Sequence, residues 1–270
     1  MNRLVGEKVS IVTSKAQTTR HRIMGIVNDE NYQIVFSDTP GVLNAAYKLH
    51  ESMMDSVNTS LKDADVLLFI TDTLENQMNH EETLEKIKKL RVPVICLINK
   101  IDLSDQEAVM ARIAYWQEQL PNAIIYPISA LHGFNLEPIW EKVIELIPES
   151  PPYYDKDEIS DRPMRFFVSE IVREKIFLNC DKEIPYSCQV EIEEYKEEAN
   201  ITRIRALIIV ERDSQRGILI GKGGDMIKRI GWDARKEIEK FIGQKVFLET
   251  YVKVDKDWRT TDSKLKKYGY

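Results

Sequence analysis

The residues Asn99-Lys100-Ile101-Asp102 follow directly after the apolar run Val94–Ile98. Such a run predicts a strand buried on both faces, and open α/β sheets bind their ligands at the carboxyl ends of these strands. The aspartate can accept two hydrogen bonds from a planar ring with neighbouring N–H donors, and the asparagine amide can donate and accept at the ring edge. The lysine stem can lie along the ring face. This cluster is therefore a candidate site for a ring such as guanine.

Three further polar clusters lie near the predicted ends of other segments. Asp38-Thr39-Pro40-Gly41 follows the β-type run Tyr32–Ser37. The aspartate could hold a magnesium ion through its water shell, and the glycine would let a backbone N–H approach a phosphate, but a ligand-free turn explains Thr-Pro-Gly equally well. Thr19, in a polar loop, could ligate magnesium, although such residues are also common in ordinary loops. The backbone N–H groups of Ser129-Ala130-Leu131 could meet a base carbonyl.

The predicted order of elements would bring these clusters together. In residues 1–150, strand-like runs alternate with helix-like segments, which predicts βα units and a largely parallel sheet with right-handed crossovers. The predicted strands are Ile23–Val27, Tyr32–Ser37, Val66–Thr71, Val94–Ile98 and Ile124–Ile128, and the predicted helices are 48–63, 80–90, 104–119 and 136–147. Because the carboxyl ends of parallel strands share one edge of the sheet, we expect the clusters to converge there.

In this order, the clusters resemble the guanine-nucleotide signatures of the translation-factor-related GTPases, which have an α/β P-loop-NTPase-like (Ras-like) fold. The resemblance implies GTP or GDP and Mg²⁺ as ligands, with Asn99 and Asp102 reading guanine, Lys100 packing on the ring, and Thr19 and Asp38 around the metal. The implied GTP-binding residues are Asp38, Thr39, Pro40, Gly41, Val42, Asn99, Lys100, Ile101, Asp102, Ser129, Ala130 and Leu131. Val42 stands where Ras-like enzymes carry a water-orienting glutamine, so we expect slow hydrolysis without a partner. The loop after Thr13 resembles a segment that embraces a potassium ion in some such enzymes.

One signature of these GTPases is missing. No Gly-x-x-x-x-Gly-Lys-Ser/Thr phosphate loop occurs in the sequence, and Met1-Asn2-Arg3-Leu4 resembles the middle of the helix that follows such a loop. We therefore expect the first strand and its loop to be absent because a start site was assigned too late. Their absence would leave two exposed strand edges with an apolar slot between them. Since the loop supplies much of the nucleotide affinity, we expect this polypeptide to bind GTP poorly and to hydrolyse it scarcely at all.

The second half of the chain carries a Gly-x-x-Gly turn, Gly221-Lys222-Gly223-Gly224, between a short apolar helix and a longer amphipathic one. A turn with so little side chain lets a nucleic-acid backbone approach closely, and KH modules clamp about four nucleotides of single strand with such a loop. A purely structural turn is the alternative. The candidate RNA-binding residues are Arg216, Gly221, Lys222, Gly223, Gly224, Lys228 and Arg229.

The order of elements around this turn resembles the α+β type II KH domain of bacterial proteins. The predicted elements are helix 165–176, strands 187–194 and 202–211, two helices that flank the turn, and strand 245–254. The basic tail Asp255–Tyr270 could add RNA contacts, and it could equally be a helix that packs back on the domain.

A GTPase domain joined to a type II KH domain resembles the Era family of bacterial GTPases over nearly the whole chain. The resemblance implies binding to small-subunit ribosomal RNA near its 3′ end on the small ribosomal subunit, coupled to GTP binding and hydrolysis. It also implies some peripheral association with the cytoplasmic side of the cell membrane. The alternative is a non-hydrolysing RNA-binding protein whose GTPase-like domain no longer cycles.

Composition limits the remaining choices. With 43% hydrophobic and 30% charged residues and a net charge of −6, the chain is typical of soluble globular proteins. No apolar run reaches the roughly 20 residues that span a bilayer and no signal-peptide core is present, so we expect a cytoplasmic protein. We also expect a monomer. Three scattered cysteines predict buried free thiols. The double proline within 151–164 predicts a linker between an N-terminally incomplete GTPase domain (1–150) and a KH domain with its tail (165–270).

Overall fold

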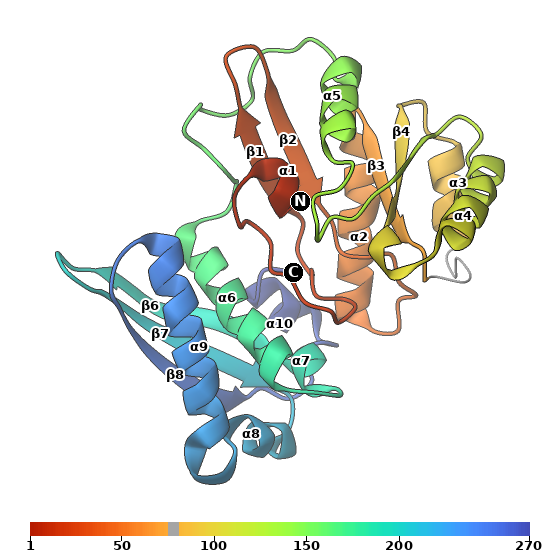
Figure 1. Cartoon of the computed structure of the whole chain (residues 1–270). Coiled ribbons are helices and arrows are strands. Elements are labelled where there is room, and N and C mark those ends of the chain that lie inside the picture. Colours follow the sequence, from red (N-terminus) through yellow and green to blue (C-terminus); the bar gives the residue numbers. More distant parts are fainter. Residues whose placement is uncertain (75–80) are drawn as a thin grey trace.

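The computed structural model describes residues 1–74 and 81–270, in which two α/β units lie side by side (Figure 1). In the first unit, β1 (Ile23–Asn28) and β2 (Gln33–Asp38) form an antiparallel hairpin, and β3 (Leu67–Asp72), β4 (Val94–Asn99) and β5 (Ile124–Pro127) form a parallel sheet. The helices of this unit are α1 (Asn2–Val5), α2 (Lys48–Asp63), α3 (Glu81–Lys88), α4 (Gln106–Gln119) and α5 (Glu137–Leu146). The predicted alternation of strands and helices is confirmed. Residue 80, where the predicted helix 80–90 begins, lies outside the described residues.

Strand β4 is the centre of the parallel sheet, and its side chains alternate between two apolar cores. Ile95 and Leu97 belong to the cluster that contains Ile139 and Val143 of α5. Cys96 and Ile98 belong to the opposite cluster, whose other buried members are Leu84, Ile87, Trp116, Leu120 and Ala123. Because helices cover both faces, every residue from Ile95 to Ile98 is at most 2% exposed. This packing fixes the point at which Asn99 leaves the sheet.

The strands described for the first unit form two separate sheets, β1–β2 and β3–β4–β5. Ile70 of β3 is 55% exposed although it lies in an apolar strand. Helix α1 packs against β1, where Met1 and Val5 side-chain atoms lie 2.7 Å from the position that a Cβ on Gly25 would occupy. That contact accounts for the absence of a side chain at residue 25.

In the second unit, α6, α8 and α9 cover one face of a three-stranded sheet in the order β6–β7–β8. Its elements are α6 (Met164–Asn179), α7 (Ile184–Ser187), β6 (Gln189–Glu197), β7 (Thr202–Val210), α8 (Asp213–Ile220), α9 (Asp225–Ile242), β8 (Val246–Val254) and α10 (Asp262–Lys267). The KH-like order predicted from the sequence is confirmed. The predicted strand 187–194 was wrong at its start, because Ser187 still belongs to α7, a short helix with proline in its first turn.

The C-terminal tail packs back on the protein. Trp258 is fully buried, and its indole N–H donates to the Ser187 carbonyl oxygen at 3.0 Å. Together with Leu265 and Tyr268, it completes an apolar cluster with Leu49 and Met53 of α2 and Leu207 and Ile209 of β7. Of the two interpretations of the tail, the structure therefore shows packing. The tail also holds the two units together, because this cluster contains residues of both units.

Two further observations bear on the expectations from composition. Cys96, Cys180 and Cys188 are buried and form no disulfide. Among the described residues, no helix is both long enough and apolar enough to cross a bilayer.

Candidate functional site

The loops that follow β4 and β5 are joined by a set of short polar contacts. The Asn99 side-chain oxygen accepts a hydrogen bond from the Ala130 N–H at 3.0 Å, and the Ile101 N–H donates to the Ile128 carbonyl. A hydrogen bond from the Ser129 hydroxyl lowers the pKa of Asp102. The structure thus brings Asn99, Asp102 and Ser129-Ala130 into one cluster, which contains an ionised carboxylate and an amide at the carboxyl edge of the sheet.

Lys100 turns sharply away from the end of β4. Its φ of 62° is in the left-handed region, which is strained for a residue with a side chain. Its ammonium group forms an ion pair with Asp72 at the end of β3, with the two atoms 2.6 Å apart. Half of the side chain remains exposed. The lysine stem is therefore held at the sheet edge, beside the cluster of Asn99 and Asp102.

Asp38 ends β2 and lies in a mostly desolvated position. Burial raises its pKa, and a hydrogen bond from the Ser10 hydroxyl, 2.6 Å from the carboxylate, opposes that rise. Nearby, Thr39 and Val42 are half-buried, Pro40 is buried, and Gly41 is exposed. A Cβ placed on Gly41 would have no atom within 4 Å, so the backbone there is open to a ligand. A carboxylate beside a hydroxyl offers the hard oxygen donors that magnesium prefers, either directly or through water.

Helix α1 links the Asp38 side of this region to the loop after β5. The Asn2 side-chain oxygen accepts from the Ser10 N–H at 2.9 Å, and its amide donates to the Ser10 carbonyl. The next residue, Arg3, donates to the Leu131 carbonyl at 3.0 Å. A continuous chain of contacts therefore joins Asp38 to Leu131. Sequence patterns did not single out Ser10, Asn2 or Arg3 for these contacts, because their partners are distant in the chain.

Thr19 is placed differently from the other predicted nucleotide residues. Its neighbour Arg20 is buried and donates to the carbonyl oxygens of Cys188, Tyr186 and Pro185, at 2.7, 2.9 and 3.0 Å. On the other side, Arg173 of α6 donates to the Thr18 carbonyl at 2.6 Å. The C-terminal unit thus holds both neighbours of Thr19. The hydroxyl bound to Asp38 is that of Ser10, and a role for Thr19 at magnesium stays a prediction.

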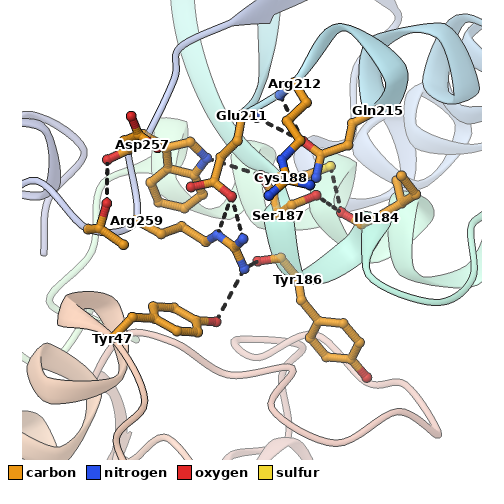
Figure 2. Close-up of polar contacts among 12 residues, drawn as sticks. Tyr47, Ile184, Tyr186, Ser187, Cys188, Glu211, Arg212, Gln215, Asp257 and Arg259 are labelled. Carbon is orange, nitrogen blue, oxygen red and sulfur yellow. Dashed lines mark hydrogen bonds and ion pairs between the residues drawn. The ribbon is translucent and has the colours of Figure 1, made fainter.

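A second contact between the units is centred on Arg259 (Figure 2). Its guanidinium forms an ion pair with Glu211, which follows β7. The same guanidinium lies 4.9 Å from the centre of the Tyr47 ring and donates to the Tyr47 hydroxyl at 3.4 Å. The Arg259 carbonyl accepts from the Leu49 N–H at 3.0 Å. The segment that runs from Gly41 to α2 is therefore tied directly to the KH-like unit.

The glycine turn of the second unit presents a bare backbone. Gly221, Gly223 and Gly224 all have positive φ values, of 72°, 65° and 82°, which favour glycine. Lys222 is exposed at the tip of the turn. Three other predicted RNA-binding side chains surround it: Lys228 donates to the Gly223 carbonyl at 3.4 Å, Arg216 pairs with Asp213, and Arg229 is exposed. The seven predicted RNA-binding residues thus lie on this turn and the two helices that flank it.

Comparisons with known proteins match this two-part arrangement. A family model described as "50S ribosome-binding GTPase" matches residues 1–100, and one described as "KH domain" matches residues 183–259. GTPase Era of Geotalea uraniireducens is 45% identical, with 100% of this chain and 92% of the relative covered. GTPase Era of Staphylococcus haemolyticus is 42% identical, with 100% and 91% covered.

Two solved structures extend the similarity to three dimensions. One is Era in complex with MgGDPNP and nucleotides 1506–1542 of 16S ribosomal RNA, with a TM-score of 0.94 and 39% identity over 100% of this chain and 92% of that chain. The other is a single-residue variant of Era of Aquifex aeolicus bound to GDP and AlF4⁻. It has the same TM-score of 0.94 and identity of 39%, over 100% of this chain and 93% of that chain.

Proposed function

We propose a function for this chain from one premise: the chain belongs to the Era family of GTPases. The proposed function is that of a GTP-binding ribosome-assembly factor. It binds small-subunit ribosomal RNA near its 3′ end and couples GTP binding and hydrolysis to maturation of the small subunit. The observation that carries this proposal is the similarity of fold, over the whole chain, to a protein solved with both a GTP analogue and a ribosomal RNA fragment.

The first unit supports the nucleotide part of the proposal. Asp102, whose pKa is lowered by the Ser129 hydroxyl, is ionised at neutral pH and can accept from the two adjacent N–H groups of guanine. Because the Asn99 oxygen is already bonded to the Ala130 N–H, the Asn99 amide hydrogens remain to donate to the ring. Asp38 would hold Mg²⁺, which would neutralise phosphate charge when bound.

The second unit supports the RNA part of the proposal. The positive φ values of the glycine turn and the exposure of Lys222 leave its backbone accessible to a phosphodiester chain. The flanking cations would add contacts to phosphate, which position the strand without reading its sequence. We therefore assign RNA binding to the unit that contains α8 and α9.

Replacement of Lys222 by alanine tests the RNA part. A single-stranded RNA from the 3′ end of small-subunit ribosomal RNA is titrated with the wild-type chain, with Lys222→Ala, and with the control Lys253→Ala. Lys253 is exposed on β8, on the sheet face opposite α8 and α9. We expect Lys222→Ala alone to weaken binding and to reduce the dependence of log K on log salt concentration by about one. Equal slopes and affinities for all three proteins would reject the assignment.

A non-hydrolysing RNA-binding protein is the second candidate. The lack of a Gly-x-x-x-x-Gly-Lys-Ser/Thr motif in the sequence favours it, because that loop supplies much of the affinity for the β- and γ-phosphates. Titration with labelled GTP, followed by an assay of phosphate release, distinguishes the candidates. GTP hydrolysis by the chain supports the GTPase function, whereas RNA binding without GTP binding supports the second candidate.

The proposal includes a cytoplasmic monomer with weak peripheral contact to the cell membrane. Sedimentation of the protein alone, and of the protein with vesicles, tests both points. A stable dimer would contradict the first, and no co-sedimentation with vesicles would contradict the second.

A further inference from the structure

We propose that the outer face of α9 is an RNA-binding surface that continues from the glycine turn, with Trp232 as a platform for base stacking. This inference rests on the proposed RNA binding and extends it to residues beyond the turn. The evidence consists of one exposed indole, the distribution of charge on α9, and the direct continuity of α9 with the glycine turn.

Trp232 is exposed to an unusual degree for its residue type. Its exposed fraction is 53%, whereas Trp116 and Trp258 are exposed by 2% and 0%. The Lys236 ammonium lies 3.5 Å from the centre of the Trp232 ring and covers one of its faces. With Lys236 over one face, a base would stack on the other face of the ring. A large aromatic side chain held open in this way is more informative than a scattered exposed aliphatic residue.

The position of Trp232 on α9 follows from helical geometry. Ile230, Ala234 and Ile238 are fully buried against the sheet. Trp232 lies two residues from Ile230 and from Ala234, and therefore about 200° around the helix from each. Its ring consequently points away from the domain core. In Figure 1, α9 lies on the outside of the lower unit and leads directly out of the glycine turn.

Most carboxylates of α9 are bound to neighbouring elements, whereas most of its cations are exposed to solvent. Three of its carboxylates are engaged internally: Asp233 accepts from Asn179, Glu237 pairs with Lys8, and Glu239 accepts from the Val246 N–H. The cations on the exposed side are Lys228, Arg229, Lys236 and Lys240. Within the residues that the structure describes, none of these four forms an ion pair. The acidic residues on this side are Asp225, at the helix N-terminus, and Glu239, which lies two turns beyond Trp232. With four cations and two carboxylates, the exposed face carries a net positive charge.

A cationic stripe that contains one open aromatic ring suits a single-stranded nucleic acid. The cations attract the phosphate backbone, and the ring can stack on any base because every base has a π face. Trp232 lies eight residues beyond Gly224, so it is displaced from the turn by about 12 Å along the helix axis. We infer that the turn holds the clamped segment and that the nucleotides next to it continue along α9 to Trp232. The structure assigns these outer nucleotides to α9.

The test compares two RNA lengths and two exposed aromatic residues. The full chain, Trp232→Ala and Tyr251→Ala are titrated with a single-stranded RNA of about four nucleotides, the length that a KH turn clamps, and with one of about ten. Tyr251 is a matched control because it is 48% exposed on the same unit but on the other face of the sheet. We expect Trp232→Ala to weaken binding of the long RNA by about 5- to 150-fold and to leave the short RNA unchanged. Tyr251→Ala should bind both RNAs as the wild type does.

Two further measurements sharpen the outcome. Trp232→Phe should recover much of the lost affinity because phenylalanine also stacks, and the long RNA should quench tryptophan emission of the wild type more than that of Trp232→Ala. If the wild type binds the long RNA and Trp232→Ala binds it equally well, the inference is wrong while the proposed RNA binding stands. If the wild type binds neither RNA, both are wrong. Loss of binding to anionic vesicles, without loss of RNA affinity in Trp232→Ala, would assign α9 to a membrane instead and overturn the inference.

Discussion

His21 gives the protein a defined sensitivity to acid. Its ring stacks on Tyr270, with the centroids 4.3 Å apart, and desolvation with three nearby arginines lowers its pKa to about 4. The unfolded chain protonates histidine near pH 6.5, so between pH 6.5 and 4 it binds more protons than the folded chain, and stability falls as the pH falls. His21→Phe keeps a ring and removes the titration. In urea denaturation, we expect the wild type to lose about 2 kcal/mol more than the variant between pH 6.5 and 4.5. Parallel curves would contradict this assignment.

The ion pair between Arg259 and Glu211 should contribute to the stability of the protein. Both side chains are largely buried, so Arg259→Met leaves the Glu211 carboxylate without its partner and removes the contact with Tyr47. We expect the free energy of unfolding to fall by about 3 kcal/mol, because a buried charge that loses its partner is strongly destabilising. Arg205→Met, in an exposed pair with Glu249, is the control and should change stability far less. The idea fails if both variants have the same urea midpoint.

At the scale of the element, the glycine turn makes different demands at neighbouring positions. A Cβ on Gly221 would lie 2.8 Å from the Met226 Cβ and 2.9 Å from its backbone nitrogen, whereas a Cβ on Gly223 would have no atom within 4 Å. Gly223, with φ 65° and ψ 15°, is in the left-handed region, where alanine costs about 1 kcal/mol. Gly221, with φ 72° and ψ 178°, is in a region that essentially only glycine adopts, so its backbone cost is about 1–3 kcal/mol. Gly221→Ala must in addition displace the start of α9. We expect a clearly larger loss of thermal stability for Gly221→Ala than for Gly223→Ala, and the reverse order would reject the geometry of the turn.

Local sequence patterns predicted some helices, strands and turns of this protein and missed others. The apolar run before Asn99 predicted β4, because a strand covered by helices on both faces needs uninterrupted apolar residues. The glycine turn was visible because few residues other than glycine adopt its backbone angles. Short helices such as α7 have too few residues to show a periodicity, and α7 displaced the predicted start of β6. The packing of Trp258 depends on α2 and β7, which no local pattern in the tail reveals.

At the scale of the molecule, the loop 10–20 connects the two units and was the least predictable part of the candidate site. The motif around Thr19 suggested a metal ligand, yet the structure uses its neighbours to bind the other unit. Lys15 likewise donates to the carbonyls of Phe177 and Cys180. A positively charged side chain in a loop can bind a phosphate, a water molecule or a distant carbonyl oxygen. The sequence alone does not show which of these is its partner. The loop therefore has to be tested as a connection between units.

Arg20 is the side chain on which that connection most directly depends. It is 3% exposed, and its guanidinium donates to three carbonyl groups of the segment 185–188. Arg20→Ala removes its donor from all three acceptors, of which the Tyr186 carbonyl keeps a hydrogen bond from Arg259. Each interface acceptor left without a donor costs about 1–3 kcal/mol. Because each unit keeps its own apolar core, the loss should weaken the interface more than either unit.

In urea, we therefore expect the wild type to unfold in one transition and Arg20→Ala in two, observed by tryptophan emission and by far-ultraviolet circular dichroism. Arg22→Ala is the matched control, since Arg22 pairs with Asp63 within the first unit, and it should retain one transition. A single, merely shifted transition for Arg20→Ala would show that the units do not depend on this contact to unfold together.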